Sequence, residues 1–199
     1  MLTTTATDAT PRLADMLAAD VGIVRVVHRM DGMRGFGMAI RSGIEAARGD
    51  YVVPFMADLS DNPEDIPKLL RKAEEGAEVV VGSRFIGGMR AYGYSSTKLV
   101  SNRLYNAFLR MLFGLKVKDC TNAFKLYSRR LLSGMRLESK GFEINAEMII
   151  KAHMMHARIA EVPTEWRERR AGRSKMRLLN VWKDYGLVAI RLFLRRLFR

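Results

Sequence analysis

Residues 51–84 decide the fold, and they read YVVPFMADLSDNPEDIPKLLRKAEEGAEVVVGSR. The apolar runs at 51–55 and 77–82 are short and rich in valine, which is typical of buried strands. Between them, Asn62 and Pro63 open a segment that predicts a helix to about residue 75, because proline is favoured just inside a helix start. A strand, a helix and a second strand in succession indicate an α/β fold with a largely parallel sheet.

The same alternation continues on both sides of this stretch. We expect helices at 10–19, after the 31–37 loop to residue 47, and at 97–113, 142–155 and 178–198. Further strands are expected at 22–28 and 157–162, and 119–127 is a mixed polar stretch. There is no internal repeat and no long linker, so 199 residues suit one α/β domain.

The charge distribution predicts an anionic partner. The chain carries 34 Lys+Arg against 21 Asp+Glu, a formal net charge of +13. Residues 1–80 are slightly acidic, so the basic excess lies in the second half, where it fits a phosphorylated substrate or anionic lipid. Nucleic acid is not expected as a partner, because the sequence has no helix-turn-helix, RNP or zinc-finger signature.

Two further absences limit the class of protein. The single cysteine, Cys120, excludes an internal disulfide framework and a multi-cysteine zinc site. No apolar run reaches membrane-spanning length, and residues 1–20 lack the pattern of a signal peptide. The sequence therefore predicts a cytoplasmic protein that is soluble or peripheral to a membrane.

Two charged side chains follow predicted strands. Asp58 comes after the first strand of the quoted stretch, and Arg84 comes after the second. Ligands of parallel α/β sheets bind at the carboxyl ends of the strands, where a carboxylate can hold a cation and an arginine can bind phosphate. The alternative for Asp58 is a loop carboxylate without a ligand.

Six motifs in consistent order resemble those of family 2 glycosyltransferases, and above all the dolichol-phosphate (polyprenyl-phosphate) mannosyltransferase branch. The resemblance covers residues 7–176, and it is carried by GIEAARGDYVV at 43–53, ADLS at 57–60, PEDIP at 63–67, VVVGSR at 79–84, KDCTNAFK at 118–125 and RRAGRSKM at 169–176.

This resemblance implies a GT-A fold and transfer of a hexose from a nucleotide sugar to a polyprenyl phosphate at a membrane surface. It implies mannose from GDP-mannose, or another sugar from a UDP-sugar, and a divalent cation, Mg²⁺ or Mn²⁺. Two alternatives stay open: another family 2 activity, such as glucosyl transfer or polysaccharide synthesis, and a catalytically impaired membrane-associated remnant.

The resemblance also assigns site residues. Asp58 matches the second acid of the family's Asp-x-Asp motif and is the expected ligand of the metal and diphosphate, but Met56 replaces the first acid. A thioether is a poor ligand for hard Mg²⁺ or Mn²⁺, so weaker metal binding is expected, unless Asp61 or water substitutes. Arg84 and Arg169 are expected to neutralise phosphate charge. The other expected substrate-binding residues are Ser60, Lys98, Ser174 and Lys175.

The start of the chain departs from the family pattern. Residues 3–10 resemble the remains of a turn that follows the second strand in relatives, so the first βαβ portion is expected to be missing. Its loss would leave interior strand edges without partners, which predicts poor stability or a homo-oligomer.

The end of the chain predicts a basic amphipathic helix at 177–199, which follows a catalytic domain at 1–176. An apolar stripe that includes Tyr185, Val188, Ala189 and Leu192 is accompanied by arginines near the end of the helix. Such a helix can lie on an anionic membrane, which would place the protein at the inner face of the membrane. The alternative is that the stripe packs on the domain core.

Overall fold

The computed structural model describes residues 2–4, 8–29, 34–88, 91–168 and 178–198. In chain order the elements are β1 (Leu2–Thr4), α1 (Thr10–Asp20), β2 (Val26–His28), α2 (Phe36–Ala46), β3 (Tyr51–Val52), the 3-10 helix η1 (Pro63–Asp65), α3 (Ile66–Glu74), β4 (Val79–Ser83), β5 (Ala91–Tyr92), α4 (Ser96–Phe113), β6 (Lys125–Ser128), α5 (Arg129–Ser133), α6 (Ile144–Met154), β7 (Ile159–Pro163), β8 (Trp166–Arg167) and α7 (Leu178–Leu197).

The central sheet has the strand order β3-β6-β4-β7. Strands β3, β4 and β7 run in one direction, whereas β6 lies antiparallel between β3 and β4. The expected α/β architecture is confirmed. Strand β6 was not predicted, because most of it lies in the stretch 119–127 that was described only as mixed and polar. That strand was missed because it begins at the charged residue Lys125, which is nevertheless fully buried.

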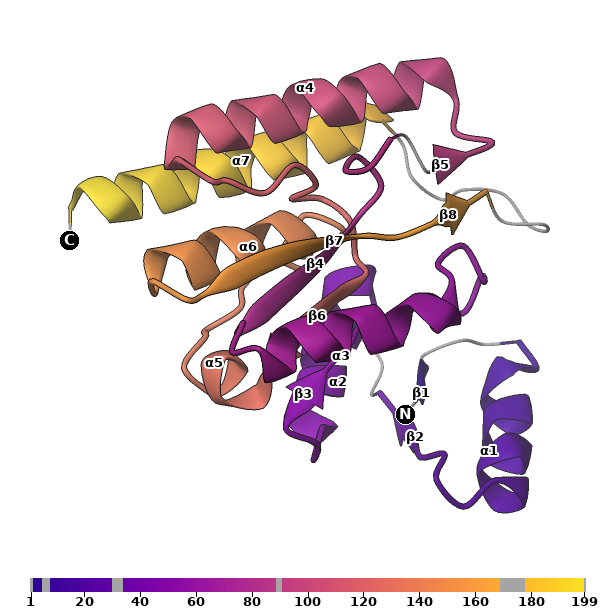
Figure 1. Cartoon of the computed structure of the whole chain (residues 1–199). Coiled ribbons are helices and arrows are strands. Elements are labelled where there is room, and N and C mark those ends of the chain that lie inside the picture. Colours follow the sequence, from indigo (N-terminus) through magenta and orange to yellow (C-terminus); the bar gives the residue numbers. More distant parts are fainter. Residues whose placement is uncertain (1, 5–7, 30–33, 89–90, 169–177, 199) are drawn as a thin grey trace.

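Helices cover both faces of this sheet (Figure 1). Successive side chains of a strand point to opposite faces, so β4 contributes to two separate cores. Val79 and Val81 pack with residues of α4, α6 and α7, while Val80 packs with Leu69 of α3 on the other face. The all-apolar run that predicted β4 is therefore explained by burial on both faces.

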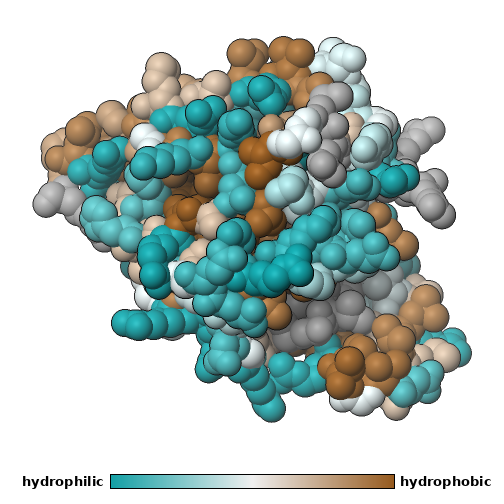
Figure 2. Space-filling view, in the orientation of Figure 1, coloured by the Kyte–Doolittle hydropathy of each residue, from teal (hydrophilic) through white to brown (hydrophobic). Residues whose placement is uncertain are grey.

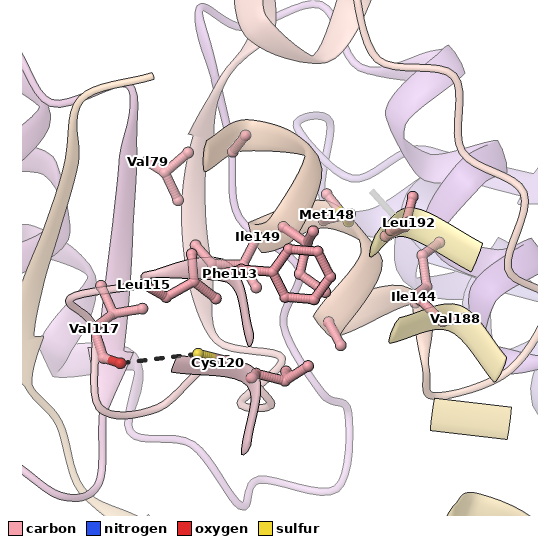
Figure 3. Close-up of a cluster of buried hydrophobic side chains, with 14 of the residues drawn as sticks. Val79, Phe113, Leu115, Val117, Cys120, Ile144, Met148, Ile149, Val188 and Leu192 are labelled. Atoms are coloured by element: carbon pink, nitrogen blue, oxygen red, sulfur yellow. Dashed lines mark hydrogen bonds between the residues drawn. The ribbon is translucent and has the colours of Figure 1, made fainter. Parts of the chain in front are cut away.

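Helix α7 belongs to the larger core. Tyr185, Val188, Ala189 and Leu192 are all buried in it, and Figure 3 shows Val188 and Leu192 beside Ile144 and Met148 of α6. These four residues come from the stripe that was expected to face a membrane. For them the expectation was wrong, because the stripe completes the core above α6.

The cations of α7 also make contacts within the domain. Arg191 and Arg195 form ion pairs with Glu138, with N–O distances of 3.3 and 3.0 Å. Arg196 donates a hydrogen bond of 3.1 Å to the carbonyl of Phe113. These arginines hold α7 to the domain, so they are not the free lipid-binding cations that the sequence suggested.

The N-terminal elements form a small unit beside the main sheet (Figure 1). Strand β1 pairs in parallel with β2, although the sequence predicted only the remains of a turn there. The predicted strand at 22–28 shortens to Val26–His28, and Ile23 is 91% exposed in the turn before it. Its β-branched composition was thus misleading as a sign of burial.

Candidate active site

The candidate site lies at the edge of the sheet where β3, β4 and β7 end. Because β6 runs the opposite way, its beginning reaches the same edge and brings the preceding loop with it. A cavity there is lined by Phe36, Met56, Asp58, Ser60, Asp61, Arg84, Tyr94, Lys98, Ser101, Asn102, Tyr105, Thr121, Asn122, Ala123, Phe142, Asn145, Trp166, Glu168 and Tyr185. One cavity therefore collects side chains from the sheet edge, α4, α6 and α7.

The loop after β3 supplies the carboxylates. Oδ1 of Asp58 accepts a hydrogen bond of 3.1 Å from the backbone N–H of Ser60, which closes a tight turn. Leu59, between them, has a φ of +57°, a left-handed conformation that is unusual for a bulky side chain. Strained backbone of this kind is concentrated at functional sites, where the surrounding structure must hold it in place.

Asp61 follows in the same loop and is buried in the cavity wall. Asp61 as a whole is only 3% exposed, and its Oδ1 atom has no hydrogen-bond partner in the described part of the chain. Burial raises the pKa of Asp61 to about 7, an effect that Arg84 opposes and Asp58 reinforces. An ionisable group with so perturbed a pKa in a cavity is a marker of function.

A buried ion pair supports the end of β4. Nε and Nη2 of Arg84 donate to the two oxygens of Asp119, at 2.7 and 2.8 Å, and the backbone N–H of Arg84 also donates to Asp119. Burial alone would raise the pKa of Asp119, but the Arg84 guanidinium outweighs it and holds the pKa below its usual range. Arg84 lines the cavity, yet much of its charge is balanced by Asp119.

The loop before β6 is held by buried polar groups. Nδ2 of Asn122 donates to the carbonyl of Gly82 at 2.7 Å, and Nζ of Lys125 donates to the carbonyls of Cys120 and Asn122. Burial lowers the pKa of Lys125 to about 8, and the Asp119 carboxylate offsets only part of this shift. The loop is thus an ordered wall of the site.

Helix α4 forms the opposite wall. Lys98, Ser101, Asn102 and Tyr105 face the cavity from successive turns of this helix. Nδ2 of Asn102 donates to Oγ1 of Thr121 at 2.9 Å, which joins α4 to the loop that carries Asp119. The hydroxyl of Tyr105 donates to the Tyr185 carbonyl, so α7 is fixed to the same wall.

Four of the seven predicted site residues meet in this cavity. Asp58, Ser60, Arg84 and Lys98 all line it. The other three, Arg169, Ser174 and Lys175, lie outside the described residues.

The sequence reading gave no role to Asp119, Lys125 or Trp166. Asp119 and Lys125 stand in the KDCTNAFK motif at 118–125, whose mixed polar composition gave no sign that both charged side chains would be buried. Nothing in the sequence indicated that Trp166 would form an isolated antiparallel bridge with Asp61.

Comparison with known proteins identifies the family. The model of "Glycosyl transferase family 2" matches residues 4–135, which is well over half of the chain. The chain belongs to glycosyltransferase family 2. This confirms the family inferred from the motifs and makes the protein a transferase.

Two relatives of this family 2 glycosyltransferase are named for lipid acceptors. This chain is 33% identical over 181 residues to a polyprenol monophosphomannose synthase of Mycolicibacterium smegmatis, and the match covers 87% of this chain and 68% of the relative. It is 34% identical over 176 residues to an undecaprenyl-phosphate mannosyltransferase of Micrococcus luteus, covering 85% of this chain and 71% of the relative.

Solved structures show the same GT-A-like fold. Two are of the glucosyl-3-phosphoglycerate synthase of Mycobacterium tuberculosis, one with UDP, the other with UDP, Mn²⁺ and glucosyl-3-phosphoglycerate. The UDP complex has a TM-score of 0.65 and 26% sequence identity, and the match covers 98% of this chain and 67% of that structure. The complex with UDP, Mn²⁺ and glucosyl-3-phosphoglycerate has a TM-score of 0.66 and 25% identity, and the match covers 97% of this chain and 66% of that structure. The expected fold is therefore confirmed.

The residues present fit a divalent cation. Asp58, Ser60 and Asp61 offer carboxylate and hydroxyl oxygens in one cavity, and the Oδ1 atom of Asp61 lacks a hydrogen-bond partner among the residues that the structure places. Among the described residues there is no group of three or more His, Cys, Asp or Glu side chains that could hold a metal. Two carboxylates suffice for Mg²⁺, which commonly keeps several waters and binds substrate phosphates.

Proposed function

We propose that this glycosyltransferase moves a sugar, mannose in the first place, from a nucleotide sugar such as GDP-mannose to a polyprenyl phosphate at a membrane surface. The names of both mannosyltransferase relatives support this choice of sugar and acceptor. The observation that carries it is the cavity itself. One wall bears carboxylates, and the other is a helix with a polar inner side and an apolar outer side.

The donor diphosphate is assigned to the wall formed by the sheet edge. Asp58 would hold the divalent cation, and Arg84 would donate hydrogen bonds to phosphate oxygens beside it. A bound cation would supply positive charge against the diphosphate as it leaves. Because Arg84 is already paired with Asp119, its main contribution is directed hydrogen bonding rather than net charge.

The acceptor phosphate is assigned to the α4 wall, where Lys98 supplies a cation. An oxygen of the acceptor phosphate attacks the anomeric carbon and forms the new C–O bond. The bond from that carbon to the donor diphosphate breaks, and its electron pair leaves with the diphosphate. A phosphate is ionised at neutral pH, so no strong general base is required, and charge stabilisation is the main task of the residues.

The outer side of α4 offers a surface for the membrane. Val100, Leu104, Phe108 and Met111 recur at intervals of three or four residues and are exposed, so they lie along one side of the helix. Figure 2 shows apolar surface along the upper edge of the molecule, where Figure 1 places α4. The exposed Arg103 and Arg110 on the same helix can each contribute about 1 kcal/mol near an anionic surface.

Helix α7 adds a second exposed apolar row next to α4. Leu187, Ile190, Leu194 and Leu197 are exposed, unlike the buried stripe of the same helix. Within the described residues, no helix has the length and hydropathy to cross a bilayer. We therefore propose peripheral binding, at the inner face of an anionic membrane, through the outer sides of α4 and α7.

Vesicle flotation tests this membrane surface. We expect the wild type to float with anionic vesicles and L104E/M111E to lose this binding. A matched control is L13E/M16E, which changes exposed apolar residues of α1. If the α4 variant floats as well as the α1 control, this surface does not bind the membrane.

A second candidate function is glucosyl transfer to a small phosphorylated acceptor, which the synthase structures favour. Transfer assays distinguish the two. Radiolabelled GDP-mannose and UDP-glucose are each offered with undecaprenyl phosphate in vesicles or with phosphoglycerate in solution. The proposal predicts solvent-extractable labelled lipid from GDP-mannose. Radiolabel found only in the phosphoglycerate product would support the second function. If no donor and acceptor combination gives transfer, the chain is a catalytically impaired remnant.

A further inference from the structure

Asp61 is a second carboxylate of the loop after β3 that lies in the cavity wall. Met56 and Asp61 line the same cavity as Asp58. The sulfur of Met56 is a poor ligand for Mg²⁺ or Mn²⁺, which prefer oxygen. Within the loop after β3, Asp58 alone would offer the cation a single carboxylate, whereas Asp61 provides a second one.

Within the described residues, no hydrogen bond to Oδ1 accounts for the burial of the Asp61 side chain. Asp61 is 3% exposed, and its Oδ1 atom accepts no hydrogen bond from any residue that the structure describes. Buried polar atoms almost always have a partner, so an orphaned carboxylate oxygen in a cavity wall indicates a missing ligand. The nearby Asp65 is the contrast, because its two oxygens accept from Lys68 and from the backbone N–H of Glu165.

The backbone around Asp61 is fixed in place. Asp61 forms a bridge with Trp166, and the carbonyl of Ser60 accepts a hydrogen bond of 2.8 Å from the Arg167 N–H. On the other side, Asn62 caps η1 by accepting from the N–H of Glu64. A carboxylate on a rigid support is preorganised to bind an ion.

The charges around the cavity also favour a cation. Asp61 interacts electrostatically with two buried cations, Arg84 and Lys125. It also interacts with two other carboxylates, Asp58 and Asp119. Asp119 is committed to Arg84. Lys98 and Glu168 also line the cavity and carry opposite charges, so carboxylates outnumber cations by one in this group, and Asp58 and Asp61 are the two carboxylates on the loop after β3.

We propose that Asp61 is the second carboxylate ligand of the divalent cation and takes over the role of the acid that Met56 replaces. This inference rests on the proposed function, because the cation is expected to bind together with the donor diphosphate. It assigns the metal site to Asp58 and Asp61, with the Ser60 hydroxyl beside them.

Direct Mn²⁺ binding tests the proposal. Free Mn²⁺ is measured by electron paramagnetic resonance during titration of the full chain with GDP or UDP present. We expect D61N to weaken Mn²⁺ binding at least about tenfold. D65N is the matched control, because it changes a buried carboxylate outside the cavity, and it should bind Mn²⁺ like the wild type. Equal Mn²⁺ affinity in D61N and the wild type would overturn the proposal.

A second measurement reports the location of the ion without changing Asp61. In a W182F variant, Trp166 is the remaining tryptophan of the two in the chain and lines the cavity. Bound Mn²⁺ is expected to quench its fluorescence in the presence of nucleotide, and an absence of quenching would overturn the site.

The outcomes separate this proposal from the proposed function. A wild type that binds nucleotide without any Mn²⁺ overturns the metal site and leaves sugar transfer standing. A wild type that binds neither overturns both.

Discussion

Replacement of Arg84 by methionine should destabilise the protein strongly. The side chain of Arg84 is 6% exposed and that of Asp119 is fully buried, and two charge-assisted hydrogen bonds join them. Removing one partner of a buried ion pair costs about 3–5 kcal/mol, because an uncompensated charge stays behind. For a chain of this length that loss lowers the melting temperature by about 6–20 °C.

The double variant R84M/D119N separates the ion pair from the rest of the site. Asp119 accepts from the backbone N–H groups of residues 84 and 122 on its two different oxygens, and the single side-chain oxygen of asparagine can keep one of these two hydrogen bonds. The orphaned charge is removed, so the double variant should be more stable than R84M by about 1 kcal/mol or more.

Urea unfolding followed by circular dichroism measures these differences. K72M is the matched control, because Lys72 forms an exposed pair with Glu75, and such pairs contribute about 1 kcal/mol or less. If R84M costs no more than K72M, or if R84M/D119N is less stable than R84M, our account of a buried, mutually dependent pair is refuted.

Three other predictions concern the core and its buried groups. L192A should cost about 2–5 kcal/mol and L194A less than about 0.5 kcal/mol in urea unfolding, because Leu192 is buried in the core and Leu194 is exposed on the same helix; equal losses would contradict the packing of α7. Burial raises the pKa of Cys120 to about 12, so iodoacetamide should label it only as fast as the protein unfolds, and rapid labelling of folded protein would contradict its burial. Burial lowers the pKa of Lys125 to about 8, so between pH 8 and its ordinary value near 10.4 the unfolded chain binds more protons. Stability from this residue should therefore rise with pH across that window, and K125M should lack this part of the slope.

The sequence predicted those parts of the fold that depend on local pattern. Strand β4 and helices α3, α4 and α6 were found because apolar periodicity and the proline after Asn62 are local signals. Strand β6 was missed, since the burial of Lys125 depends on Asp119 and on two backbone carbonyls that only the folded chain brings together.

The candidate site was predictable to a similar extent. Asp58 and Arg84 could be placed because each follows a strand, and Lys98 was found through the family resemblance. The partnership of Arg84 with Asp119 spans 35 positions, and no spacing rule connects them. The apolar stripe of α7 shows the same limit, because a helical pattern does not say whether core or lipid covers it.

The central claim is that one cavity binds the donor at its carboxylates and the acceptor at α4. The most direct test compares D58N and K98A for two quantities, the KM for polyprenyl phosphate and the affinity for the nucleoside diphosphate with Mn²⁺. We predict that K98A raises the acceptor KM at least about tenfold and leaves nucleotide affinity unchanged, since removing a charged partner costs about 1.5–3 kcal/mol. D58N should weaken Mn²⁺-dependent nucleotide binding instead. Variants that change both quantities together, or neither, would contradict the claim.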